Sequence, residues 1–270
     1  MGGIFSSSFG SDGEHTTCGS IDARIEKLIY SPPVGRTEKD IQSCYNSVRD
    51  HHHKLTTNNN RIISVMECSP PNKSSKYIIF SHGNAGDIFS YSCYIKYLVR
   101  ELNVNVVIYD YIGFGLFEPI NPTEKRCYQS LDTVMNYFIN ERKIDKQDLF
   151  LIGQSLGTGI VVDCVSKHDW TTPIMLISPY KTIPKVVMDT SCTRPIEKFD
   201  TWSKISKVMC PVKIVHGTHD EVINVKHGKT LHGCLKNKAL EPLWMDNCGH
   251  NDILDRIPTS CYLDVINYSG

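Results

Sequence analysis

Short runs of apolar residues alternate along most of this chain with longer stretches in which apolar side chains recur every three or four positions. From residue 77 onward, the short runs predict buried β-strands, because strands covered on both faces are apolar throughout. They are Tyr77–Phe80, Val104–Tyr109, Leu149–Ile152, Ile174–Ile177, Val212–Val215 and Pro242–Met245. The alternation predicts the α/β class, with a central, mostly parallel sheet and helices on both faces.

The longer stretches between these runs predict amphipathic helices. Apolar residues share one helical face from Tyr91 to Leu102 and again from Tyr128 to Ile139, and Pro122 favours a helix start just before the second stretch. A third apolar face runs through residues 254–265, where Pro258 should split the helix because proline cannot lie deep inside one.

Upstream of residue 77, two further apolar runs, Ile25–Tyr30 and Ile62–Met66, predict strands that open the sheet, antiparallel to each other or to the rest. Between them lies His51–Asn60, which contains three consecutive histidines and three asparagines. Three histidines could bind a metal ion, but the polar, Asn-rich surroundings favour a solvated loop.

Length and composition narrow the class of protein. The chain has 270 residues, with 29 Lys+Arg and 29 Asp+Glu, so it lacks the basic surplus on which nucleic-acid binding depends. No apolar run approaches the roughly 18 to 20 residues that span a bilayer, and no secretory signal is visible. We therefore expect a cytoplasmic protein with a flexible tail over residues 1–22 and one domain over 23–270. Residues 179–210 have few long apolar runs and should form a small insertion over the active site.

The N-terminus and the cysteines bear on location. Met1–Ser6 matches the N-myristoylation pattern with Gly2 as the acceptor, although a disordered tail rich in Gly and Ser would have the same composition. One myristoyl chain binds membranes only weakly, and Cys18 could carry a second acyl group. Acylation would place the protein peripherally on the cytosolic face of membranes. The 11 cysteines include no CxxC pair, which favours reduced thiols over disulfides or a zinc site.

The sequence Gly153-Gln154-Ser155-Leu156-Gly157 follows a predicted strand directly and leads into apolar residues that continue as a helix. This is the context of a nucleophile elbow, in which a strained turn exposes a serine hydroxyl. Side chains at Gly153 and Gly157 would collide with the neighbouring strand and helix. The helix N-terminus directs free amide groups and a positive dipole at the reacting oxygen. Ser155 is therefore the predicted nucleophile.

A serine nucleophile needs a base, and the base needs an orienting carboxylate. In this arrangement the chain order is serine, acid, histidine. Asp220 and His250 each follow a predicted strand at its carboxyl end, where α/β sheets place their ligands, so we predict a triad of Ser155, Asp220 and His250. His216, which lies at a strand end, is better suited to a structural hydrogen bond. The other acids and bases that remain open are Glu221, Asp246, His216 and His219.

An oxyanion hole should complete the site. The loop Ser81–Gly86 follows the first predicted strand of the parallel series, from which such enzymes donate a backbone amide. The predicted donors are the N–H groups of Leu156 and Asn84, with Ala85 as the alternative to Asn84. We expect His82 to brace the loop rather than transfer protons.

Together these motifs resemble the α/β-hydrolase superfamily and, within it, the alpha/beta hydrolase domain-containing protein 17 group of acyl-protein thioesterases. The resemblance runs from about Tyr77 to His250 and is carried by the segments 81–85, 109–115, 153–158, 216–223, 241–244 and 249–252. It implies an α/β-hydrolase fold, removal of palmitate from cysteines of membrane-associated proteins, and no cofactor. It also carries nucleophile, acid and base onto Ser155, Asp220 and His250.

One departure concerns the membrane. The resembled group has a palmitoylated cysteine cluster near its N-terminus, whereas this chain has only Cys18 there, so a myristoylated Gly2 would have to substitute. The substrates expected are S-acylated proteins or lipid esters, because a triad does not distinguish thioester from oxyester. A carboxylesterase or monoacylglycerol lipase is therefore the first alternative. A catalytically silent, membrane-associated binding module is the second.

Overall fold

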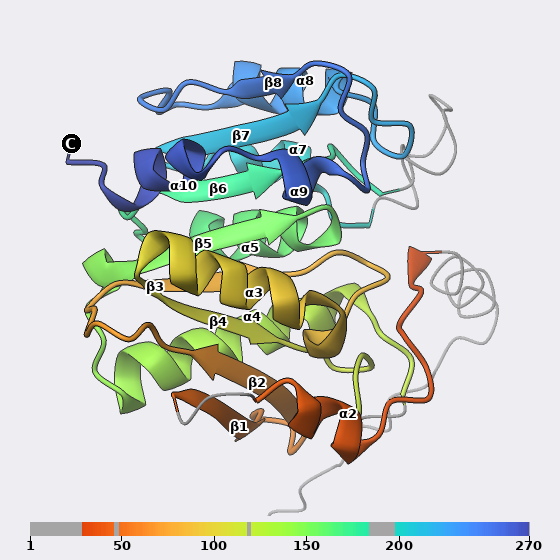
Figure 1. The fold of residues 1–270 in the computed structure, drawn as a ribbon. Coiled ribbons are helices and arrows are strands. Elements are labelled where there is room, and N and C mark those ends of the chain that lie inside the picture. Colours follow the sequence, from red (N-terminus) through yellow and green to blue (C-terminus); the bar gives the residue numbers. More distant parts are fainter. Residues whose placement is uncertain (1–28, 46–48, 118–119, 184–197, 270) are drawn as a thin grey trace, which may run out of the picture.

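A computed structural model describes residues 29–45, 49–117, 120–183 and 198–269. Its centre is an eight-stranded sheet with the order β1-β2-β4-β3-β5-β6-β7-β8 (Figure 1). The strands are β1 Asp50–Thr56, β2 Ile62–Cys68, β3 Tyr77–Ser81, β4 Asn105–Tyr109, β5 Leu149–Gln154, β6 Ile174–Ile177, β7 Val212–Gly217 and β8 Leu243–Met245. Strands β3 to β8 are parallel, whereas β1 and β2 are antiparallel to their neighbours.

The central strands are buried along their whole length, as their unbroken apolar sequences predict. All residues of β3, β5 and β6 are buried. Strand β5 lies between β3 and β6, with Gly153 opposite both Ser81 and Leu176. The turn that follows β5 therefore emerges in the middle of the sheet, next to the loop that follows β3.

Helices cover both faces of the sheet and enclose one apolar core on each (Figure 1). One face carries α3 Ile88–Leu102, α9 Ile253–Arg256 and α10 Thr259–Ile266. The other carries α4 Glu124–Asn136, α5 Leu156–Lys167, α7 Thr201–Ile205 and α8 Lys226–Cys234, while the short α2 Glu38–Ser43 precedes β1. The prediction of an α/β fold with helices on both faces is confirmed.

Helix boundaries follow local sequence chemistry. Thr123, directly after Pro122, caps α4 by accepting a hydrogen bond from the amide of Arg126, which confirms the predicted start. Helix α4 continues as a short π-helix over Tyr137–Glu141. Pro258 is the N-cap residue of α10 and separates it from α9, as predicted from its missing amide proton.

The prediction of a loop over His51–Asn60 is wrong for its first half. Residues 50–56 form β1, which pairs with β2 in register from Asp50 opposite Cys68 to Thr56 opposite Ile62. Only Leu55 of this strand is buried, because β1 is an edge strand whose stability comes from backbone pairing rather than an apolar face. The Asn-rich second half is the hairpin turn, with Asn60 at a positive φ of 55°.

The strand predicted over Ile25–Tyr30 falls mostly outside the described residues. Its described part, Ile29 and Tyr30, lies in no strand, so the prediction fails there. These two residues are buried instead by tertiary contacts, with the Tyr30 ring edge-on to Phe114 and Phe199. The sheet opens with β1 in place of this segment.

Three other sequence predictions fall partly or wholly outside the described residues. Gly2 and Cys18 lie there, as do residues 184–197 of the insertion predicted at 179–210. On the carboxyl side of that gap, α7 packs among the helices of its face. None of the helices that the structure describes combines the length and the apolar character needed to cross a membrane.

Candidate active site

Ser155 lies at the turn between β5 and α5, with a strained backbone. Its φ of 51° and ψ of −116° fall outside the usual regions for a residue with a side chain, so the surrounding structure must hold the turn in place. The amide of Ser155 donates to the carbonyl of Ile177 on the neighbouring strand at 2.9 Å. Ser155 is only 9% exposed and lies at the carboxyl end of β5, at the edge of the sheet where the parallel strands end.

Two glycines make room for this turn. A Cβ atom at Gly153 would lie 2.6 Å from the carbonyl oxygen of Gly157, and a Cβ at Gly157 would lie 2.0 Å from the carbonyl oxygen of Ser81. Both separations are far shorter than van der Waals contact. The predicted steric reason for the two glycines is therefore confirmed: one faces the first turn of α5, the other faces the end of β3.

His250 joins Ser155 to Asp220. Its Nε2 atom lies 3.1 Å from Ser155 Oγ, and its Nδ1 atom lies 2.8 Å from Asp220 Oδ2. An ionised carboxylate can only accept a hydrogen bond, so Nδ1 carries the proton and Nε2 presents its lone pair to the serine hydroxyl. The three side chains come from loops after β5, β7 and β8 and form one continuous chain of hydrogen bonds.

Asp220 is held in its ionised form. Burial opposes its charge, but hydrogen bonds from His216 and His250 and from the backbone amide of Ile223 outweigh this, so the pKa of Asp220 falls well below its usual range. Oδ1 accepts the amides of Val222 at 3.0 Å and Ile223 at 2.7 Å, which leaves Oδ2 for His250. The carboxylate is thereby fixed in orientation as well as in charge.

The alternative acids and bases do not contact Ser155. His219, Glu221 and Asp246 are exposed, and within the described part of the chain none of them bonds to Ser155 or His250. His216 is fully buried, and its Nε2–H is shared between the carbonyl of Ile223 at 2.7 Å and Asp220 Oδ2 at 3.4 Å. It therefore has the structural hydrogen bond that its position at a strand end predicts.

The loop after β3 is held on several sides. His82 braces it, as predicted: Nδ1 donates to the carbonyl of Gly83 at 2.8 Å, and the ring stacks on Tyr111 with centroids 4.2 Å apart. The hydroxyl of Tyr111 donates in turn to the carbonyl of His82 at 2.6 Å. Asn84 uses its side chain to fix the preceding chain, since Nδ2 donates to the carbonyl of Ile29 and Oδ1 accepts from the amide of Ser31.

Tyr91, on α3, connects this loop to the turn that contains Ser155. Its hydroxyl accepts from the amide of Gly83 at 3.2 Å and donates to Oε1 of Gln154 at 2.9 Å. Gly83 directly precedes Asn84, and Gln154 directly precedes Ser155. In the sequence, Tyr91 is recognisable only as part of an apolar helix face, so this role could not be predicted from it.

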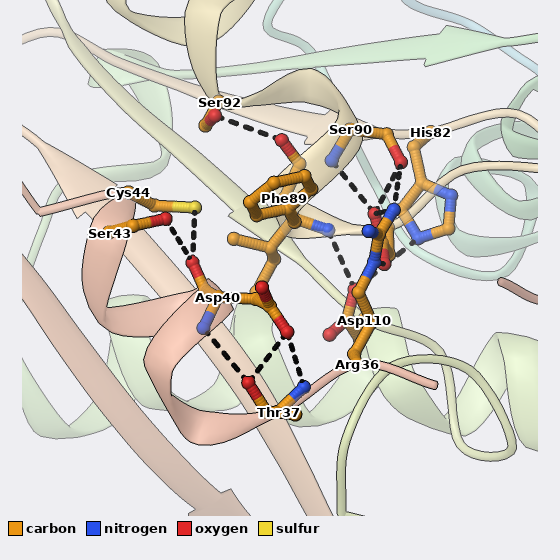
Figure 2. A network of polar contacts seen from close by, with 12 residues as sticks. Arg36, Thr37, Asp40, Ser43, Cys44, His82, Phe89, Ser90, Ser92 and Asp110 are labelled. Atoms are coloured by element: carbon orange, nitrogen blue, oxygen red, sulfur yellow. Dashed lines mark hydrogen bonds and ion pairs between the residues drawn. The ribbon is translucent and has the colours of Figure 1, made fainter. Parts of the chain in front are cut away.

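A second network fixes the far end of the same loop, where α3 begins (Figure 2). Asp87 caps α3 by accepting from the amide of Ser90 at 2.8 Å, and it forms an ion pair with Arg36 at 2.6 Å. Burial opposes the charge of Asp87, but the bonds from Arg36 and Ser90 lower its pKa below the usual value. Asp110 accepts from the amide of Ile88 at 2.9 Å. No sequence motif pointed to these contacts, because Arg36 and Asp87 are far apart along the chain.

Ser155, His250 and Asp220 thus meet at the carboxyl edge of a mostly parallel eight-stranded sheet whose second strand is antiparallel. This combination of fold and site defines the class of α/β hydrolases. Comparison with known sequences places the chain in the same class. An alpha/beta hydrolase of Acanthamoeba polyphaga mimivirus is 42% identical over 254 residues, which cover 92% of this chain and 95% of that protein. The chain belongs to the α/β-hydrolase family.

The predicted resemblance to one group within the family is confirmed at lower identity. Human alpha/beta hydrolase domain-containing protein 17B is 34% identical over 219 residues, which cover 80% of this chain and 72% of that protein. Mouse protein 17C is 35% identical over 201 residues, which cover 73% of this chain and 61% of that protein. The chain thus spans about three fifths of the length of protein 17C. No family model matches the sequence.

Solved structures agree on the fold. An esterase from Pyrococcus furiosus superimposes with a TM-score of 0.68 at 18% identity, covering 88% of this chain and 97% of that one. Est1E from Butyrivibrio proteoclasticus, solved with ferulic acid, gives a TM-score of 0.65 at 16% identity, covering 80% of this chain and all of that one. At such identities the likeness shows the fold alone.

Proposed function

We propose that this α/β hydrolase is a serine hydrolase that cleaves acyl thioesters, with Ser155 as nucleophile, His250 as base and Asp220 as the orienting acid. The catalytic part of this proposal rests on one observation, the series of hydrogen bonds from Ser155 Oγ through His250 to Asp220 Oδ2. A serine hydroxyl is a weak nucleophile until a neighbouring base accepts its proton. His250 would be that base, because Nδ1 carries its proton and Nε2 is free to accept the proton of Ser155.

The first half-reaction forms an acyl-enzyme. Ser155 Oγ attacks the carbonyl carbon of the thioester while its proton passes to His250 Nε2, 3.1 Å away. Asp220 stabilises the resulting imidazolium and keeps its ring oriented. When the carbon–sulfur bond breaks, the leaving thiolate takes the proton from His250. In the second half-reaction, water attacks the acyl-enzyme by the same route and releases the fatty acid.

The negative charge that develops on the carbonyl oxygen needs donors. Leu156 is the first residue of α5, so its N–H has no acceptor within the helix and lies at the positive end of the helix dipole. The N–H of Asn84 is the second proposed donor, and its loop is fixed by the contacts of His82, Tyr91 and the Asn84 side chain. Loss of one such donor typically lowers the rate by about a hundredfold to a thousandfold.

What supports this substrate class is the sequence similarity to proteins 17B and 17C rather than the triad. The resemblance to this group implies S-palmitoylated cysteines of membrane-associated proteins as substrates. Access to them would be favoured by an N-terminal acyl chain, and we propose that Gly2 is myristoylated, with Cys18 as the second acylation site. Such a protein would act at the cytosolic face of membranes. Mass spectrometry of the protein from its native cell tests this directly, and a free Gly2 amine would contradict it.

The decisive experiment compares a palmitoylated cysteine peptide with an oxyester lipid of equal chain length, using the full chain and its Ser155→Ala variant. We expect thioester hydrolysis that the variant loses. A preference for the oxyester would instead make the protein a carboxylesterase or monoacylglycerol lipase. Absence of turnover together with failure of a fluorophosphonate to label Ser155 would contradict a catalytic role and leave a binding module.

A further inference from the structure

Three potential metal ligands of different chemistry converge at the C-terminal end of α5. A carboxylate oxygen of Asp132, the thiol sulfur of Cys164 and a ring nitrogen of His168 all lie within 4.8 Å of one another. Cys164 is on α5 and His168 is its C-cap residue, four positions later, while Asp132 is on the adjacent helix α4. A spacing of four residues places two side chains on the same side of a helix, as in known zinc-binding helices.

The charge of Lys167 acts on both Asp132 and Cys164, and its ammonium pairs with Asp163 at 2.5 Å. Among the described residues, the side chains of Asp132, Cys164 and His168 neither donate nor accept a hydrogen bond. The thiol is the buried member, since Cys164 is only 3% exposed, whereas Asp132 and His168 are exposed. The thiol sulfur therefore lies at the buried end of the cluster, and the two exposed side chains lie on its solvent side.

The cluster opens into a cleft of about 1040 Å³ between β1 and the helices α4 and α5. Asp132, Cys164 and His168 all line this cleft, together with His53 and Trp170. Solvent and ions can thus reach the three ligand atoms. Ser155 begins the same helix at its other end, and the rise of an α-helix puts Cys164 roughly 14 Å further along it. The cluster is consequently separate from the candidate active site.

We propose that Asp132, Cys164 and His168 form a binding site for a Zn²⁺ ion that ties α4 to the end of α5. Zinc takes thiolate, imidazole and carboxylate ligands in tetrahedral geometry, and three protein ligands leave the fourth position for a water from the cleft. The usual zinc–ligand bonds place neighbouring ligand atoms about 3.5 Å apart. Rotation of the exposed Asp132 and His168 side chains would bring their ligand atoms from within 4.8 Å to this shorter distance from the Cys164 sulfur.

Binding exchanges a proton for the metal. The Cys164 thiol loses its proton to solvent as the sulfur–zinc bond forms, because only the thiolate is a strong zinc ligand. Without a metal, burial together with the carboxylates of Asp132 and Asp163 raises the pKa of Cys164 to about 12, although the nearby Lys167 ammonium acts in the opposite direction. Because metal binding releases the thiol proton, the affinity of the site for Zn²⁺ should increase as the pH rises.

The histidines of β1 are the obvious competing ligands, since they line the same cleft or lie beside it. His52 is bonded through Nε2 to the hydroxyl of Ser64 at 2.7 Å, and His53 is bonded through Nε2 to Glu67 at 2.8 Å. His51 is exposed. None of them contributes a thiolate, so a spectroscopic signal from sulfur distinguishes the two sites.

The test is titration of the metal-free, reduced full chain with Co²⁺, which occupies zinc sites and gives a thiolate-to-metal charge-transfer band only when sulfur is bound. We expect one equivalent of Co²⁺ to produce this band and one equivalent of Zn²⁺ to abolish it. Asp132→Asn and His168→Ala change exposed residues and should leave the fold intact. Each should weaken binding by at least about tenfold, and Cys164→Ser should remove the band.

Matched controls are Cys93→Ser, which removes an exposed thiol on α3, and His51→Ala, which removes an exposed imidazole on β1. Both should titrate like the parent chain. The proposal is overturned if no band forms, if the band survives in Cys164→Ser, or if the exposed-ligand variants bind as tightly as the parent. The outcome does not depend on the catalytic proposal, because the readout is metal binding.

Discussion

The hydroxyl of Tyr91 donates to the side-chain oxygen of Gln154 at 2.9 Å and in the same position accepts from the amide of Gly83. Tyr91 therefore links the residue before the proposed nucleophile to the residue before the proposed oxyanion donor Asn84. The distance between the two loops sets where an oxyanion can bind. We infer that Tyr91 is a positioning residue for the reaction proposed above.

Replacing Tyr91 by Phe should lower kcat by about tenfold with little change in KM. The ring and its packing remain, and only the bond that sets the spacing of the oxyanion donors is lost, which matters most in the transition state. The affinity for a trifluoromethyl ketone inhibitor should fall in parallel, as this adduct mimics the oxyanion. Tyr94→Phe is the matched control, since Tyr94 is also on α3 and its half-buried hydroxyl is bonded to that of Tyr262 on α10. Equal losses of kcat in the two variants would contradict a positioning role, because they would show only that α3 had been disturbed.

Asp220→Asn should reduce kcat by more than a thousandfold while the protein remains folded. The amide would still fit the site but would stabilise the wrong tautomer of His250, as in other serine triads. Glu221→Gln, one residue along the same loop, removes an exposed carboxylate and should leave turnover nearly unchanged. Steady-state hydrolysis of the thioester peptide measures both. A large loss in Glu221→Gln with a small one in Asp220→Asn would reassign the acid.

Gly157→Ala should destabilise the fold by about 3 kcal/mol or more, because its Cβ would be forced 2.0 Å from a backbone carbonyl oxygen that cannot rotate away. Gly233→Ala, in α8, is the opposite case, since no atom lies within 4 Å of the position of its Cβ. That substitution should stabilise the protein by about 0.5 to 1 kcal/mol through helix propensity. Urea unfolding of the two variants against the parent measures both changes. Similar free energies for the two would contradict the steric account.

The pH dependence of stability should change in Asp110→Asn. Burial raises the pKa of Asp110 to about 7, so the folded protein keeps this proton between pH 4 and pH 7 while the unfolded chain has released it. Asp110 therefore makes the free energy of unfolding fall as the pH rises through this range, by up to about 1.4 kcal/mol per unit. The variant should lose that slope.

His82 lies beside Asp110, with its Nε2 4.0 Å from Asp110 Oδ1, and contributes in the opposite sense. Burial lowers the pKa of His82 to about 4, so the unfolded chain binds a proton below about pH 6.5 that the folded protein does not. With Asp110 replaced, stability should increase with pH between about 4 and 6.5. Urea unfolding at pH 4.5 and 6.5 tests this, and identical slopes in variant and parent would refute it.

The sequence by itself determined the parallel strands of the sheet and much of the candidate site. Apolar runs specify strands β3 to β6 because such strands are buried on both faces, and the motif around Ser155 specifies a turn that only glycine neighbours allow. Asp220 and His250 could be predicted because parallel strands bring their carboxyl ends to one edge of the sheet. These inferences need only the local pattern and the class of fold.

The tertiary structure decided the features in which distant segments meet. Edge strand β1 has a polar sequence and is formed by pairing with β2, so its pattern indicated a loop. The contacts of Tyr91 with Gln154, and of Arg36 with Asp87, join positions too far apart in the chain for any periodicity to reveal. Side-chain hydrogen bonds and ion pairs depend on which residues become neighbours, and the packing of helices against the sheet determines that.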